Sequence, residues 1–141
     1  MRWTIAAILF GFALTSWAED AGEIKNASGT VYLERDGKRL PARAGTPVRQ
    51  SDTLVTGADG AAGVTFTDNS LLSIGPNSTL AIDSYAFDST THRGQFDASL
   101  RKGTLAVISG KIVKQSPDAM RVRTPASIMG VRGTEFVVRV E

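Results

Sequence analysis

The sequence contains no cysteine and only one histidine in 141 residues. It therefore has no disulfide framework, no thiolate metal site and no cysteine nucleophile, and a metal site would need oxygen ligands alone. Five prolines and 14 glycines are too few for a collagen-like or low-complexity chain, and a hydrophobic content of 42% is too high for intrinsic disorder. We therefore expect one globular domain with its own core and without a cofactor.

Long hydrophobic runs are also missing. The longest apolar stretch, Trp3–Leu14, is too short to cross a bilayer as a helix, which takes roughly 20 residues. Arg2 precedes it, and Ser16-Trp17-Ala18 follows as a small-x-small cleavage pattern. Residues 1–18 are therefore predicted to be a signal peptide, with an uncleaved membrane anchor as the alternative.

This prediction sets the compartment and the domain limits. An exported domain without any cysteine suits the bacterial periplasm, and we expect no stable membrane insertion once the signal has been removed. Residues 19–28 are interpreted as a short leader, and residues 29–141 as the folded domain.

The spacing of turn-forming residues in the remaining chain is typical of a β protein. Gly, Pro, Asn and Asp recur about every ten residues, with short runs rich in Val, Ile, Leu, Phe and Thr between them. No apolar stripe of helical period is evident, so any helix should be short. The pattern predicts an all-β domain of many short strands, either twisted and solenoid-like or sandwich-like. The expected strands are Val31–Arg35, Lys38–Leu40, Thr53–Thr56, Ala62–Thr67, Leu71–Ile74, Leu80–Asp83, Gln95–Arg101, Gly103–Ser109, Met120–Thr124, Ser127–Val131 and Thr134–Val140.

Turn residues support these limits. Asp36-Gly37 separates two extended runs and favours a tight hairpin turn with positive φ at both central residues. Gly57, Gly60 and Gly75 are expected to provide positive φ or close backbone approach. Pro76 and Pro125 are expected where strands break, because proline lacks the N–H donor of a ladder.

Residues for catalysis are scarce. The only histidine, His92, lies in a polar stretch without a nucleophile-elbow pattern, and we expect it to be a solvated loop residue. Asp83, Asp88 and Asp97 are of the type that glycoside hydrolysis requires, with Asp83 and Asp97 as the best pair. Because no further catalytic set is present, the protein is not expected to be an enzyme, and no metal site is expected.

Charge is distributed unevenly. Residues 19–100 carry seven Lys and Arg against 11 Asp and Glu, a balance of −4, whereas residues 101–141 carry eight against three, a balance of +5. Arg121 and Arg123 should project from one side of a strand, and Arg139 should also face solvent. We predict these three arginines as the partner-binding residues, since a surface of opposite charge would be steered toward them. The export signal disfavours nucleic acid as the partner.

An ordered series of turn-and-strand fragments makes the sequence similar to that of a known protein family. The fragments follow one another from Gly29 to Phe136, and each is common by itself, but their order and spacing are specific. The fragments are Gly29-Thr30-Val31, Gly45-Thr46-Pro47-Val48, Asp52-Thr53-Leu54-Val55-Thr56-Gly57, Asp59-Gly60-Ala61-Ala62, Val64-Thr65-Phe66-Thr67-Asp68-Asn69-Ser70, Leu72-Ser73-Ile74-Gly75-Pro76-Asn77-Ser78, Leu100-Arg101-Lys102-Gly103-Thr104-Leu105, Arg123-Thr124-Pro125-Ala126 and Gly130-Val131-Arg132-Gly133-Thr134-Glu135-Phe136. With this series of fragments, the sequence resembles the FecR domain of bacterial periplasmic proteins across nearly all of residues 29–141.

The resemblance implies a non-enzymatic, all-β module that works in the periplasm. The family's regulators add a sigma-binding segment and a signal-receiving domain, and neither pattern is found here, so direct control of a sigma factor is not expected. We expect a sensory or protein-interaction module whose partner is another envelope protein, bound at strand edges or at the basic C-terminal face. The alternative is an envelope polysaccharide-binding module, for which Tyr32, Tyr85 and Phe87 would have to supply the aromatic surface.

Overall fold

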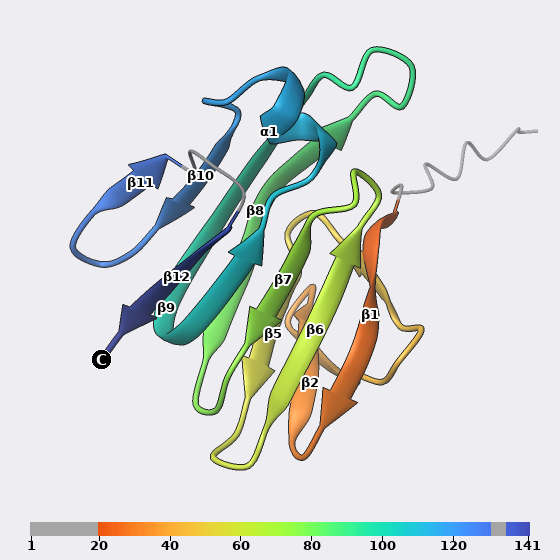
Figure 1. The fold of residues 1–141 in the computed structure, drawn as a ribbon. Helices are drawn as coiled ribbons and strands as arrows, with labels where there is room; N and C mark the ends of the chain where they lie inside the picture. Colours follow the sequence, from red (N-terminus) through yellow and green to blue (C-terminus); the bar gives the residue numbers. More distant parts are fainter. Residues whose placement is uncertain (1–19, 131–134) are drawn as a thin grey trace, which may run out of the picture.

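The computed structural model describes residues 20–130 and 135–141, and strands dominate both parts (Figure 1). The predicted signal peptide, residues 1–18, lies outside the described residues. One helix, α1 (Lys111–Gln115), interrupts the strands; the sequence did not predict its position, but it is short, as expected of any helix in this chain. The strands are β1 (Asp20–Ser28), β2 (Val31–Arg35), β3 (Lys38–Pro41), β4 (Pro47–Arg49), β5 (Thr53–Thr56), β6 (Ala61–Phe66), β7 (Leu71–Ile74), β8 (Thr79–Phe87), β9 (Gly94–Ile108), β10 (Met120–Arg123), β11 (Ile128–Gly130) and β12 (Glu135–Val140).

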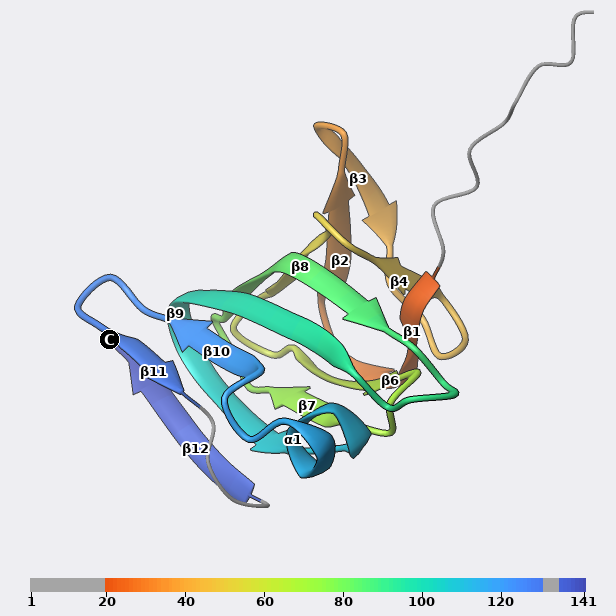
Figure 2. The same cartoon turned by 90° about the horizontal axis from the view of Figure 1, so that it is seen from above.

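The described strands form a single 12-stranded sheet that curls on itself, so the all-β prediction is confirmed. One half has the order β3-β2-β5-β8-β9-β10-β11, and the other has β12-β9-β7-β6-β1-β4. Figure 2 shows the two halves meeting along β9. Neighbouring strands are antiparallel, except for the parallel pair of β9 and β10.

The strand β9 joins the halves because it bends in its middle. It pairs with β8 as far as Lys102 and with β7 from Leu105 onward. Gly103, between these ladders, has a φ of +97°, and a side chain there would collide with Ser78. Glycine therefore permits the bend, and the two strands predicted at Gln95–Arg101 and Gly103–Ser109 are one continuous strand.

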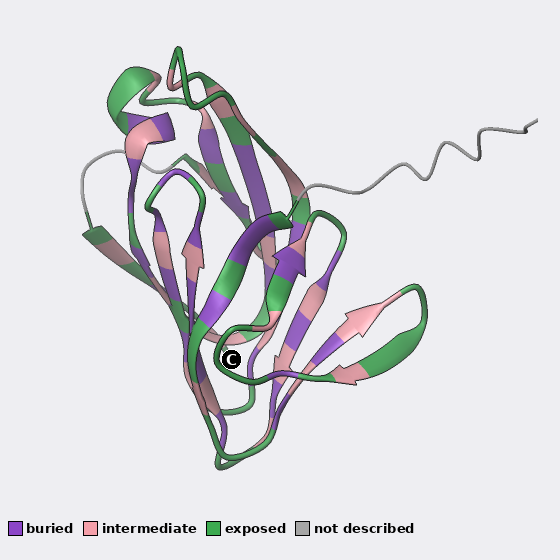
Figure 3. Ribbon diagram, turned by 90° about the vertical axis from the view of Figure 1, so that its right-hand side faces the viewer, coloured by how far each residue is buried: buried purple, intermediate pink, exposed green. Residues whose placement is uncertain are grey.

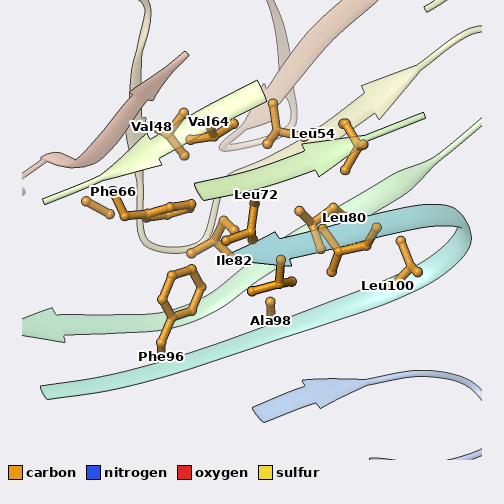
Figure 4. Close-up of a cluster of buried hydrophobic side chains, with 14 of the residues drawn as sticks. Val48, Leu54, Val64, Phe66, Leu72, Leu80, Ile82, Phe96, Ala98 and Leu100 are labelled. Carbon is orange, nitrogen blue, oxygen red and sulfur yellow. The ribbon is translucent and has the colours of Figure 1, made fainter. Parts of the chain in front are cut away.

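The core fills the space between the halves. Buried and exposed residues alternate along most strands, as period-two pleating requires (Figure 3). Figure 4 shows side chains from both halves in contact, with Phe66 and Phe96 at one end and Leu80 and Leu100 at the other. The ring centroids of Phe66 and Phe96 lie 4.5 Å apart in an edge-on arrangement. The inner face of each half is therefore apolar, and the polar residues point outward.

The N-terminal segment belongs to this core. The sequence predicts a leader over residues 19–28, but Asp20–Ser28 forms β1, which pairs with β4 and β6. Ala21 and Ile24 of β1 are buried. A register shift between Ile24 and Asn26 breaks the regular alternation along this strand.

The predicted turns have mixed outcomes. Asp36 and Gly37 both have positive φ, at 52° and 74°, as the hairpin prediction requires. Gly60 is a site of close approach, because a side chain there would collide with the carbonyl of Thr30. Gly75 is different, since it has neither a positive φ nor a tight contact, so the prediction was wrong there.

Candidate interaction surface

The hairpin of β10 and β11 forms one margin of the sheet. Met120 and Val122 of β10 are buried in the core, whereas Arg121 and Arg123 are exposed. The alternation predicted for this strand is therefore confirmed. Met129 of β11 lies opposite Val122 and packs against the core, so Ile128 and Gly130 share the outer face with the arginines.

The outer face of this hairpin combines positive charge with an exposed apolar side chain. Arg123 lies directly across from Ile128, which is 64% exposed. In the described part of the chain, neither Arg121 nor Arg123 takes part in an ion pair. We call Arg121, Arg123 and Ile128 the hairpin face. Arginine is enriched at protein interfaces, and an exposed apolar side chain beside it offers apolar area that a partner can bury.

Arg139, the third predicted binding residue, lies in the other half of the sheet. It is exposed on β12, which pairs with the second part of β9, whereas β10 pairs with the first part. Because the inner faces of the two halves enclose one core, their outer faces point to different sides. The three arginines therefore do not form one continuous stripe.

A cleft of about 590 Å³ separates the hairpin from β12. Its wall on the hairpin side is formed by residues 124–127 and Met129, and the opposite wall by residues 137–141. Ile128 and the hairpin arginines are not part of this lining. The cleft and the hairpin face are thus separate features.

The candidate carboxylate pair lies on an outer sheet face. Asp97 accepts hydrogen bonds from the Ser84 hydroxyl at 2.9 Å and from the Gln95 amide at 2.6 Å. Asp83 accepts a hydrogen bond from the hydroxyl of Ser99. A pocket of about 310 Å³ touches Asp97, but Asp83 does not line it. The two carboxylates thus share a face, and each is engaged by a neighbouring hydroxyl group.

The aromatic residues considered for polysaccharide binding are dispersed. Tyr85 and Phe87 pack against the core, and the ring of Tyr85 meets that of Phe96 edge-on with centroids 5.0 Å apart. Tyr32 lies beneath the Arg39 guanidinium, 4.5 Å from the ring centroid. Across the paired strands, Tyr32 lies in line with Thr79 of β8. Thr79 precedes Tyr85 by six residues along this strand, so Tyr32 and Tyr85 lie about 20 Å apart. The structure does not bring these rings together as one platform.

The polar residues of the β8–β9 loop stabilise its turn. The Asp88 carboxylate accepts hydrogen bonds from the backbone N–H groups of Thr90 and Thr91, which lower its pKa. His92 has a φ of +61°, and its ring stacks on Phe87 with centroids 6.0 Å apart. These contacts are those of a turn, and they include no partner that would activate a nucleophile.

The buried polar groups of the described residues have partners. Asp52 receives two hydrogen bonds from the Arg35 guanidinium, at 2.8 and 2.7 Å, which raise the pKa of Arg35. Asp68 accepts hydrogen bonds from the backbone and hydroxyl of Ser70 and from the backbone N–H of Ile112 at the start of α1. In the described part of the chain, no buried side-chain polar atom is left unsatisfied. These groups therefore hold loops in place.

Within residues 20–130 and 135–141, no cluster of histidine and acidic side chains has the makings of a metal site. The same part of the chain contains no helix of the length and apolarity that a membrane span demands.

The fold and this surface describe an all-β module with an exposed basic hairpin at one margin of its sheet. The family model described as FecR protein matches residues 52–141, which is more than half of the chain. The chain belongs to the FecR family. Comparison with curated proteins and with solved structures gave no match. Family membership indicates a signalling or regulatory module of the cell envelope.

Sequence reasoning found part of this surface. It predicted the exposure of Arg121 and Arg123. It did not single out Ile128, although this residue lies within the predicted strand Ser127–Val131. The exposure of Ile128 could be inferred only once its cross-strand neighbour was known, because a strand of three residues is too short to show alternation.

Proposed function

We propose that this FecR-family protein is a non-enzymatic module of the periplasm that binds another envelope protein and thereby takes part in signalling. The observation that supports this function best is the hairpin face. It places two cations without ion-pair partners beside a 64% exposed isoleucine at the margin of the sheet.

The contacts of this face favour binding over a structural role. Arg121 and Arg123 sit across from Asp97 and Ser99 of β9, but Asp97 already accepts hydrogen bonds from Ser84 and Gln95. The guanidinium groups are thus available to acidic side chains of a partner. Electrostatic attraction would guide the encounter, and burial of Ile128 would add the apolar contribution.

The test is capture of partners in the native host. Tagged protein is crosslinked in intact cells, purified and analysed by mass spectrometry. We expect enrichment of one or a few envelope proteins, and the captured mature chain should begin at Glu19. The double variant R121E/R123E should reduce this capture at least tenfold, because an acidic partner surface would then be repelled.

A matched control separates this effect from a general change in charge. The variant K25E/K38E makes the same change in net charge on exposed residues of β1 and β3, and it should capture as much partner as the wild type. Equal capture by R121E/R123E, or no envelope protein captured by the wild type, would refute the proposed function.

A further inference from the structure

The strand β12 has one free edge. It pairs with β9 along its whole length, from Glu135 opposite Ile108 to Val140 opposite Gly103, without a register shift. Within the described residues, no strand pairs with its other side. The cleft between β12 and the hairpin is lined by five consecutive residues, 137–141, which include both faces of the strand. The cleft thus reaches this strand, and within residues 20–130 and 135–141 no strand occupies its second edge.

The other edge strands of the described sheet carry features that discourage pairing. The strand β3 contains Lys38 and Pro41, β4 has three residues and begins with Pro47, and β11 has only three residues. Lysine, proline and short length are the usual means of blunting an edge. β12 has six residues, neither lysine nor proline, and at its centre Val137, which is 66% exposed.

The sequence of β12 is complementary to itself. When two copies pair antiparallel about Val137, Glu135 of each copy lies opposite Arg139 of the other, and the two Val137 side chains meet at the centre. On the inner face, Phe136 of each copy lies opposite Val138 of the other. Opposite charges and apolar pairs directly across two strands are both stabilising. Every central position of the strand thus finds a suitable neighbour.

Other alignments of the same two strands are worse. A shift of two residues in one direction places Glu135 opposite Glu141, and parallel pairing in register sets Glu135 against Glu135 and Arg139 against Arg139. Like charges directly opposite destabilise a sheet. The charges therefore select the alignment centred on Val137.

We propose that the occupant of this edge is a second copy of the same chain, paired antiparallel through β12 in a two-fold symmetric dimer. The same patch serves both copies, so the contact closes after two chains and does not propagate into a fibre. The contact is small, and we expect a weak dimer that dissociates on dilution. This inference concerns another part of the surface than the hairpin face and does not rest on the proposed function.

The absence of cysteine allows a direct test. In the proposed alignment, residue 137 faces itself across the two-fold axis at a Cα separation of about 4.5–5.5 Å, which suits a disulfide. Purified V137C should form a covalent dimer rapidly under mild oxidation. The control I128C places the cysteine at a site of nearly equal exposure, 64% against 66%, and should remain largely monomeric under the same conditions.

Charge reversal tests the alignment without a crosslink. In sedimentation velocity at several protein concentrations, wild type should dimerise, whereas R139E and E135R should each weaken the dimer at least tenfold because like charges then face each other twice. The double variant E135R/R139E restores opposite pairs and should regain dimerisation. The variant R123E, on the hairpin face, should dimerise as the wild type does.

The results separate this proposal from the proposed function. A wild type that remains monomeric at every concentration, or a double variant that stays as monomeric as the single ones, would overturn the dimer. Capture of an envelope protein that depends on Glu135 and Arg139, with a monomeric purified chain, would also overturn it and show that a foreign strand takes the edge. Loss of envelope partners in R121E/R123E alone bears only on the hairpin face.

Discussion

At the scale of single residues, Tyr85 connects the core to a loop. Its ring contacts Phe66 and Phe96, while its hydroxyl accepts a hydrogen bond from the backbone N–H of Asp68 at 3.0 Å. The hydroxyl also lies 2.7 Å from the hydroxyl of Thr67. Burial raises the pKa of Tyr85 to about 12. The neutral form of this side chain is therefore the one that the fold stabilises.

This shift predicts a loss of stability in alkali. The unfolded tyrosine releases its proton at a pH of about 10, whereas the folded one keeps it to about 12, so the free energy of unfolding should fall as pH rises through this interval. The variant Y85F should be less stable by about 1 kcal/mol at neutral pH, because the N–H of Asp68 loses its acceptor. It should also show a smaller alkaline decrease. Urea denaturation at several pH values measures both effects, and parallel curves for the two proteins would contradict the assignment.

Single residues also show how far sequence reasoning reaches. The alternation of buried and exposed side chains from Met120 to Arg123 was predictable, because successive side chains of a strand point to opposite faces of the sheet. The burial of Tyr85 and the proximity of Asp83 to Ser99 were not, because they depend on which strands are neighbours. Pairing across 16 residues leaves no local trace in the chain.

At the scale of elements, the bend of β9 depends on Gly103. The Ser78 hydroxyl accepts a hydrogen bond from the N–H of Thr104 at 3.0 Å, which brings the β7–β8 loop against the bend. The sequence predicted a break at Lys102-Gly103 and therefore two strands. It could not show that the chain continues its ladders through the bend, because glycine at positive φ occurs both in turns and in bent strands.

We expect G103A to lower the free energy of unfolding by about 3 kcal/mol or more, since the new methyl group meets Ser78 at an unfavourable φ. The control G37A also has a positive φ, but nothing lies within 4 Å of the added carbon, so its cost should be only about 1 kcal/mol. Chemical denaturation of both variants tests this ranking, and an equal cost would refute the role assigned to the contact with Ser78.

Two strands, β1 and β4, were not predicted from the sequence, for related reasons. β1 is rich in polar residues and contains a register shift, so its buried residues do not follow a simple alternation. β4 is three residues long and begins with proline, which lacks an N–H donor for the ladder. Both are stabilised by tertiary pairing more than by their own composition.

At the scale of the whole molecule, β1 extends the domain beyond the limit at residue 29. It is the only neighbour of β4 in the described sheet and covers one edge of β6. A chain that begins at Gly29 loses these ladders together with the buried Ile24, whose removal alone costs about 2–5 kcal/mol.

We therefore expect the chain from Gly29 to be unfolded or easily proteolysed, whereas a chain from Asp20 should melt cooperatively by circular dichroism. In the longer chain, the variant I24V should lower the free energy of unfolding by about 1 kcal/mol. This variant tests the contribution of side-chain packing separately from that of the backbone pairing of β1. A cooperative melt of the chain from Gly29 at the temperature of the longer one would show that β1 is dispensable.

The shared strand β9 has a consequence for the order of events during synthesis. Ladders such as β2–β5 and β1–β6 can form once the chain has emerged as far as Phe66, but β7 and β8 reach their common partner only after residues 94–108 have emerged. Until then the nascent polypeptide holds two separate sets of strands with exposed apolar sides. Closure of the core and attachment of β10 and β12 follow only then, so the unfinished chain carries exposed apolar surface until β9 is complete.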